Sequence, residues 1–114
     1  MLERSRTYYL YSNPVDMRKS FNGLSGIVNN KMGRLVTDGS GYIFINKRGT
    51  HLKLLIWEED GFSIYYKRLE RGTFEHPNQG DNGRISYGKL VLILQGLEEK
   101  KMKKRVRFKG LKTG

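Results

Sequence analysis

The sequence predicts a small α+β domain in which a mainly antiparallel β-sheet, a meander, packs one face against a helix. Four runs rich in β-formers are separated by breaks that contain glycine or proline. One segment between the first two runs repeats apolar residues at helical spacing. A second, short C-terminal helix and a basic tail complete the prediction. Because 114 residues suit one domain, we expect a single domain at 1–99 and a tail at 100–114.

The first predicted strand, 7–11, reads Thr-Tyr-Tyr-Leu-Tyr and ends at the Ser-Asn-Pro of 12–14. A helix is expected to begin there, since serine or asparagine can cap it and proline suits the first helical position. Asp16 would then lie near the positive end of the helix dipole. The helix is predicted to run to about Asn30. Its apolar stripe comprises Met17, Phe21, Leu24, Ile27 and Val28.

Three more strands are predicted after a loop at 31–41. They span 42–46, 51–58 and 62–69. A three-residue loop at 59–61 would set Glu58 opposite Phe62 and Lys53 opposite Lys67. One face would then be apolar and cover the helix: Tyr42, Phe44, Leu52, Leu54, Ile56, Phe62, Ile64 and Tyr66. The other face would carry Lys53, Leu55, Trp57, Ser63, Tyr65 and Lys67.

The second helix is predicted between Ser86, an expected N-cap, and Gly96, an expected C-terminal cap. Its apolar face would contain Leu90, Ile93, Leu94 and Leu97. The run 90–94 also fits a buried strand, so both interpretations stay open at this point.

The charge indicates a polyanionic partner, because 22 Lys and Arg outnumber 11 Asp and Glu and give a net charge of +11. The tail after residue 99 is basic and contains no acid. We expect nucleic acid to contact its cations: Lys100, Lys101, Lys103, Lys104, Arg105 and Arg107.

Several classes of chemistry are disfavoured. The chain has no cysteine, and it contains neither a nucleophile motif nor a phosphate-binding glycine loop. His51 and His76 are interpreted as structural histidines, and the acids of 58–60 as turn residues rather than a metal site. We therefore expect no enzyme activity, no cofactor and no metal. No run approaches the ~20 apolar residues of a membrane-spanning helix, so a cytoplasmic protein is expected.

Basic and aromatic residues alternate on and after the predicted sheet, in a pattern typical of surfaces that bind nucleic acid. The candidate contacts are Lys53, Trp57, Tyr65, Lys67, Arg68 and Arg71. The alternative is that Trp57 and Tyr65 fill a minor core while the two arginines pair with Glu70 or Glu75.

Two sequence motifs carry a family resemblance: Asn-Pro-Val-Asp-Met-Arg-Lys-Ser-Phe at 13–21 and Tyr-Tyr-Lys-Arg-Leu-Glu-Arg-Gly-Thr-Phe at 65–74. With the runs at 42–48 and 52–57 between them, they resemble the TnpB-type accessory proteins, which are the second open reading frame products of insertion sequence 66 family elements. The RNA-guided nuclease that shares the name TnpB is a different protein. The resemblance covers roughly residues 8–77.

The resemblance implies a non-catalytic protein that works in DNA transposition beside the element's transposase. The transposase is therefore an expected partner, and the positive charge of the chain makes DNA the other. The polar residues of the two motifs that are expected to contact the transposase are Asp16, Arg18, Lys19 and Glu70. Two alternatives remain at this stage: a pure protein-interaction adaptor for the transposase, and a small basic RNA-binding protein.

Overall fold

The computed structural model describes residues 2–76 and 83–96, and it shows a five-stranded sheet in the order β4-β3-β2-β1-β5. The elements are β1 (Tyr8–Leu10), α1 (Phe21–Asn30), β2 (Gly41–Ile45), β3 (His51–Trp57), β4 (Phe62–Arg68), β5 (Arg84–Ile85) and α2 (Tyr87–Gln95). Among these described strands only β1 and β2 run parallel, with α1 between them in the chain. The predicted α+β class is therefore confirmed.

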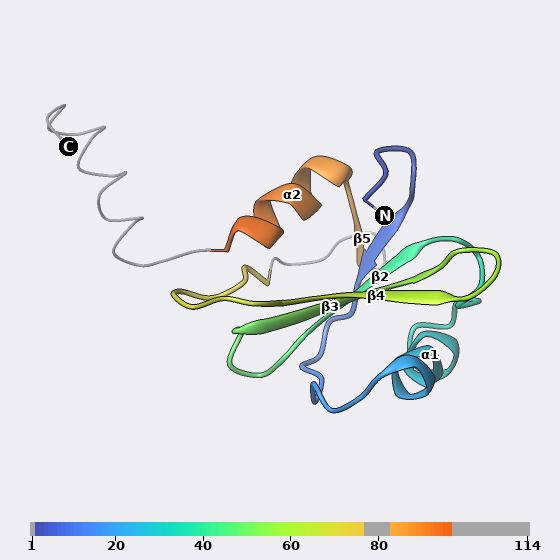
Figure 1. The fold of residues 1–114 in the computed structure, drawn as a ribbon, viewed down its shortest axis with the longest axis horizontal. Coiled ribbons are helices and arrows are strands. Elements are labelled where there is room, and N and C mark those ends of the chain that lie inside the picture. The colour runs from blue at the N-terminus through green and yellow to red at the C-terminus, as the bar shows by residue number, and fades with distance from the viewer. Residues whose placement is uncertain (1, 77–82, 97–114) are drawn as a thin grey trace, which may run out of the picture.

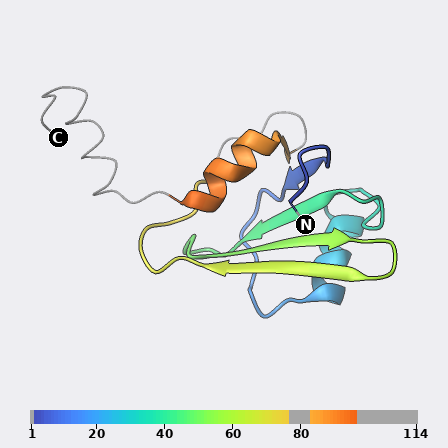
Figure 2. The same ribbon diagram turned by 45° about the horizontal axis from the view of Figure 1, so that its top comes forward.

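The two helices lie on opposite faces of the sheet (Figures 1 and 2). β2 and the middle of β3 are buried on both faces, which explains their nearly continuous apolar sequence. One core, against α2, contains Tyr8, Leu10, Ile43, Ile45, Leu52, Leu54, Ile56, Phe74, Leu90, Ile93 and Leu94. The other, against α1, contains Tyr9, Val15, Leu24, Val28, Val36, Tyr42, Phe44 and Leu55.

The predicted start of the first helix is wrong, because α1 begins at Phe21 and not near Pro14. The chain after β1 stays extended beside β2, where the amide of Val15 donates to the carbonyl of Ile45 at 3.0 Å. The Asp16 carboxylate then accepts from the amide of Arg18 at 2.9 Å. Such a local side-chain bond competes with helical hydrogen bonding, so the helix begins about two turns later in the chain than predicted.

The predicted register of β3 and β4 is also wrong. Glu58 donates its amide to the Gly61 carbonyl at 2.8 Å, which leaves a two-residue loop in place of three. Glu59 has a positive φ of 64°, as the first position of one type of two-residue hairpin turn requires. Trp57 therefore faces Phe62, and Lys53 faces Tyr66 rather than Lys67. A slip of one residue exchanges the faces of β3 relative to those of β4. Phe62 and Ile64 pack against the α1 core as predicted. Leu52, Leu54 and Ile56 were expected beside them and pack against α2 instead, so both predicted faces are wrong.

The C-terminal helix is confirmed, and the strand alternative for 90–94 is wrong. The Ser86 hydroxyl caps α2 by accepting from the amide of Lys89, and Gly96 follows the helix with a φ of 74°. β5 was not predicted. Leu97 and the predicted tail at 100–114 lie outside the described residues. Within 2–76 and 83–96, neither helix has the length and apolar character needed to cross a membrane.

Candidate functional site

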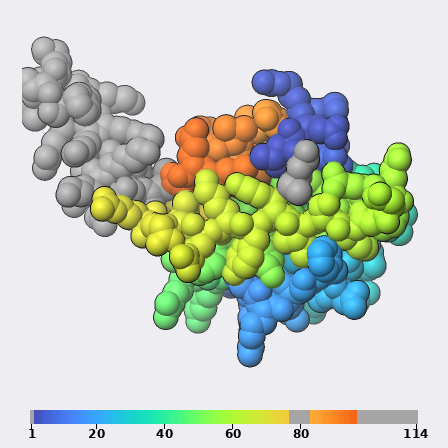
Figure 3. Space-filling view, in the orientation of Figure 1, coloured from blue at the N-terminus to red at the C-terminus, as the bar shows by residue number. Residues whose placement is uncertain are grey.

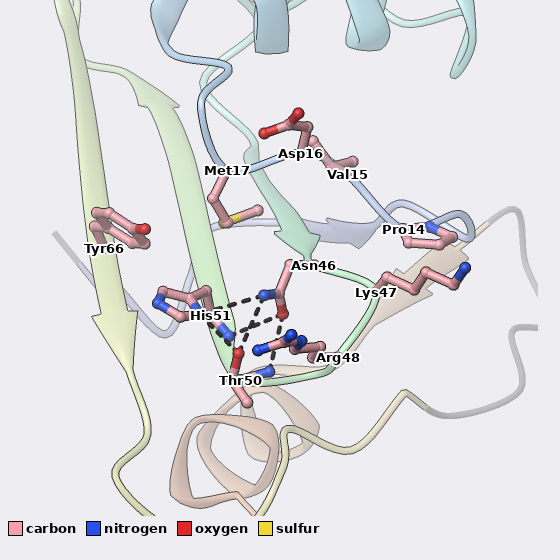
Figure 4. A pocket seen from close by; sticks show the side chains of 10 residues that line it. All are labelled: Pro14, Val15, Asp16, Met17, Asn46, Lys47, Arg48, Thr50, His51 and Tyr66. Carbon is pink, nitrogen blue, oxygen red and sulfur yellow. Dashed lines mark hydrogen bonds between the residues drawn. The ribbon is translucent and has the colours of Figure 1, made fainter.

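The turn between β2 and β3 is built around the side chain of Asn46. Its oxygen accepts from the amides of Thr50 and His51 at 2.9 and 3.0 Å. Its amide nitrogen lies 3.1 Å from the Thr50 hydroxyl and 3.2 Å from the Nδ1 of His51 (Figure 4). Gly49 takes a positive φ of 75° in this turn. The network fixes the turn and the side chains that it displays.

Two distant segments flank this turn. On one side, residues 14–17 are bonded to the end of β2 through Val15. On the other, the chain after β4 is bonded to the turn, since Leu69 donates to the Thr50 carbonyl at 2.9 Å and Phe74 to that of Gly49 at 2.7 Å. The two sequence motifs thus lie on either side of this turn, at one end of the sheet.

A groove of about 640 Å³ lies between the turn and the segment before α1; we call it the hairpin groove. It is lined by Pro14, Val15, Asp16, Met17, Asn46, Lys47, Arg48, Thr50, His51 and Tyr66 (Figure 4). In the space-filling view, the turn (green) and the segment before α1 (blue) project from the body with a hollow between them (Figure 3). A second hollow of about 390 Å³ borders the same turn and includes His76 and Phe74.

Cations dominate this end of the sheet. Lys47 and Arg48 are exposed on the turn. Arg18 binds Asp16 through two nitrogens, and these hydrogen bonds lower the pKa of the Asp16 carboxyl to about 2. Arg68, opposite His51 in the sheet, pairs with Glu70 at 2.9 Å. Both pairs are exposed to solvent, which limits their contribution to stability.

Lys53 is buried and does not lie on a binding surface, contrary to the prediction. Only 7% of it is exposed, and its Nζ donates to the carbonyls of Met17 and Lys19 at 2.8 and 2.7 Å. The ammonium also lies 4.7 Å from the centre of the Tyr66 ring. Lys53 therefore fastens the segment before α1 to the sheet, and so holds one wall of the hairpin groove.

The predicted basic and aromatic face does not form. Trp57 packs its ring 4.9 Å from that of Phe62, at the acidic end of β3. Tyr65 packs against the core under α2, and Lys67 donates to the Leu94 carbonyl of α2 at 2.8 Å. The corrected register places Lys53 and Trp57 on the α1 side and Tyr65 and Lys67 on the α2 side.

The remaining predicted site residues lie in the two segments that flank the β2–β3 turn. Asp16, Arg18 and Lys19 lie in the segment before α1, whereas Arg68, Glu70 and Arg71 lie at and after the end of β4. Arg68 pairs with Glu70, one of the two partners named in the alternative prediction; Glu75 pairs with Lys89 instead. The predicted tail contacts, from Lys100 to Arg107, lie outside the described residues.

Sequence reasoning missed Lys47 and Arg48 as site residues. Two adjacent cations in a short turn between apolar strands were the available signal. His51 was predicted to be a structural histidine, and its bonds to Thr50 and Asn46 confirm that role. In the part of the chain that the structure describes, no three His, Asp or Glu residues lie close enough to hold a metal ion.

Comparison with known proteins decides the family. A family model described as "IS66 Orf2 like protein" matches residues 6–104. This chain belongs to that family. The IS66 Orf2-like chain is therefore a transposition-associated accessory protein, as the two sequence motifs predicted.

Two curated relatives come from Sinorhizobium fredii. The IS66 Orf2-like chain is 29% identical over 93 residues to the uncharacterized protein y4jC, covering 81% of this chain and 80% of the relative. It is 31% identical over 84 residues to the uncharacterized protein y4hO, covering 73% of each. No solved structure matches the chain.

Proposed function

We propose that the protein assists transposition by binding DNA, without breaking bonds itself, through the cations around the hairpin groove. The basic segment 100–107 supplies further contacts with phosphate. The observation that carries this proposal is the position of Lys47 and Arg48 on a turn that two other segments hold in place. A fixed turn loses little conformational entropy when its cations meet phosphates.

The distribution of charge supports the same face. The cations at this end come from three segments: Arg18 and Lys19, Lys47 and Arg48, and Arg68 and Arg71. The acids Glu58, Glu59 and Asp60 lie at the opposite end of β3, in the next turn. A field polarised in this way orients a polyanion toward the hairpin groove during approach.

The test is the salt dependence of binding to a short DNA duplex. If about six phosphates are neutralised, log affinity falls with log salt at a slope of about −5. Lys47→Ala/Arg48→Ala should make that slope shallower by about 2, and deletion of residues 100–114 should also flatten it. Lys31→Ala/Arg84→Ala removes the same charge from other surfaces and should change the slope less.

A pure adaptor for the transposase is the second candidate, and the apolar half of the groove favours it. Pro14, Met17 and Tyr66 line the groove, and 52% of Tyr66 is exposed. Such a lining suits a peptide segment, with Asp16, Arg18, Lys19 and Glu70 as polar contacts at its margins. Duplex binding that is absent or insensitive to salt, together with co-purification of the transposase without DNA, would favour the adaptor over the DNA-binding function.

A further inference from the structure

The two edges of the sheet differ in their protection. β5 forms one edge with only two residues, whereas β4 forms the other with seven. Natural edge strands are usually short, bulged or interrupted by proline, which prevents pairing with another chain. β4 has no proline, and its register with β3 is unbroken from Phe62 to Arg68. Among the residues that the structure describes, β4 is therefore an open, regular edge.

The outward backbone groups of β4 can be identified from the ladder. Gly61 accepts from Glu58, and Leu69 donates to Thr50. Because hydrogen bonding alternates along an antiparallel strand, the intervening residues that bond to β3 are Ser63, Tyr65 and Lys67. The amides and carbonyls of Phe62, Ile64, Tyr66 and Arg68 point away from the sheet. No backbone hydrogen bond within 2–76 and 83–96 reaches these outward groups.

The side chains along this edge give it little charge protection. Phe62 and Ile64 are half-buried against the α1 core, and Tyr66 is half-exposed. A lysine on an edge strand commonly prevents pairing with another chain. The ammonium of Lys67, however, is bonded to the Leu94 carbonyl on the α2 side. Charge is instead placed at the two ends of β4, with Glu59 and Asp60 before it, Arg68 as its last residue and Arg71 after it.

We propose that β4 pairs antiparallel with β4 of a second copy of this chain, about a two-fold axis at Tyr65. Phe62 then faces the partner's Arg68, and Ile64 faces the partner's Tyr66. All four residues present outward backbone groups, so the pairing forms hydrogen-bonded pairs in register. The result is one continuous sheet across two subunits.

The ends of β4 make this edge complementary to itself. Antiparallel pairing brings Glu59 and Asp60 of each copy beside the partner's Arg68 and Arg71, where the two arginines outnumber Glu70. Parallel pairing would bring acid to acid and base to base, at an electrostatic cost. A second copy is therefore the occupant that the charges of this edge select.

The test uses charge reversal with rescue, on the full chain and without DNA. The unaltered protein should have twice the monomer mass by light scattering, at the highest concentration reached. Glu59→Lys/Asp60→Lys and Arg68→Glu/Arg71→Glu should each be monomeric, because both ends of the two-fold interface then repel. An equimolar mixture of the two variants should restore the doubled mass, since each end again meets its opposite charge.

Circular dichroism of each variant separates a lost interface from a lost fold. A folded, unaltered chain that is monomeric at every concentration would overturn the proposal. So would two folded variants that still dimerise, or a mixture that stays monomeric. Since the measurement involves no nucleic acid, its outcome is independent of the DNA-binding function proposed above.

Discussion

β3 runs between two turns that differ in almost every respect. The turn at its start carries Lys47 and Arg48, is organised by Asn46, and is bonded to segments on both sides. The turn at its end carries Glu59 and Asp60; Glu58 closes it, bonding the Ser63 hydroxyl and the Gly61 carbonyl. Sequence sets the charge of each turn. The first of these two turns forms one wall of a groove only because distant segments make contacts with it.

The largest effect should come from removing the bond that holds the groove wall. Lys53→Met keeps an unbranched side chain, one atom shorter, but leaves the carbonyls of Met17 and Lys19 without their cationic donor. We expect the free energy of unfolding to fall by about 1–3 kcal/mol. Chemical denaturation measures this change, and amide exchange at Val15 should accelerate as the segment loosens.

Lys31→Met is the matched control, because Lys31 is exposed just after α1. It should change stability by less than about 0.5 kcal/mol. Equal stabilities for the Lys53 and Lys31 variants would show that the buried ammonium does not fasten the groove wall.

The basic turn should also be intolerant of a side chain at Gly49. Its φ of 75° is left-handed, and an added Cβ would lie 3.2 Å from the Cβ of Thr73. We expect Gly49→Ala to cost about 1–2 kcal/mol, mostly from the backbone conformation. Thermal unfolding measures the loss. A Gly49→Ala protein as stable as the parent would mean that this turn relaxes and is not held by its flanks.

The acidic turn should respond in the opposite direction. Glu59 occupies a φ of 64° as a residue other than glycine, so Glu59→Gly relieves strain. Part of that gain is offset by the larger entropy of glycine in the unfolded chain. We expect a net stabilisation of about 0.5 kcal/mol, measured by thermal unfolding. A loss of stability would indicate that the Glu59 side chain makes a contribution that its exposed position does not suggest.

The smallest effect concerns the pair of Asp16 and Arg18 at the groove. The pKa of Asp16 lies at about 2, below its ordinary value of 3.8, chiefly because Arg18 donates to the carboxylate. The pair is therefore complete above pH ~4 and is lost as the pH falls through about 2. Carboxyl NMR should give that midpoint, and Arg18→Ala should move it toward the ordinary value. No measurable change in stability at neutral pH is expected, because both side chains are exposed.

Local signals predicted much of the fold. The cap at Ser86 and the glycine at 96 placed α2, because both act within one turn of chain. The four main strands followed from their β-rich runs and their glycine-containing breaks. The helix start near Pro14 failed because hydrogen bonds to β2, a distant segment, outweighed a favourable local cap.

The candidate site was predicted less well, for a reason that lies in one turn. A loop of two residues in place of three shifted β4 by one position and separated Lys53 from Lys67. Nothing in the composition of the strand distinguishes the two registers, since Phe62, Ile64, Tyr65 and Tyr66 are apolar or aromatic on both faces. Lys53 was for the same reason taken as a surface cation rather than a buried donor.

The sequence by itself determined the excess of positive charge, both helices and the four main strands, and the motifs that place the chain in the IS66 Orf2-like family. Only the tertiary structure decided which face each β3 side chain occupies, where α1 begins and that Lys53 is buried. Those features depend on hydrogen bonds between residues far apart in the chain, whose energy no local pattern contains. Long-range hydrogen bonds also hold the two sequence motifs on either side of the turn that carries Lys47 and Arg48.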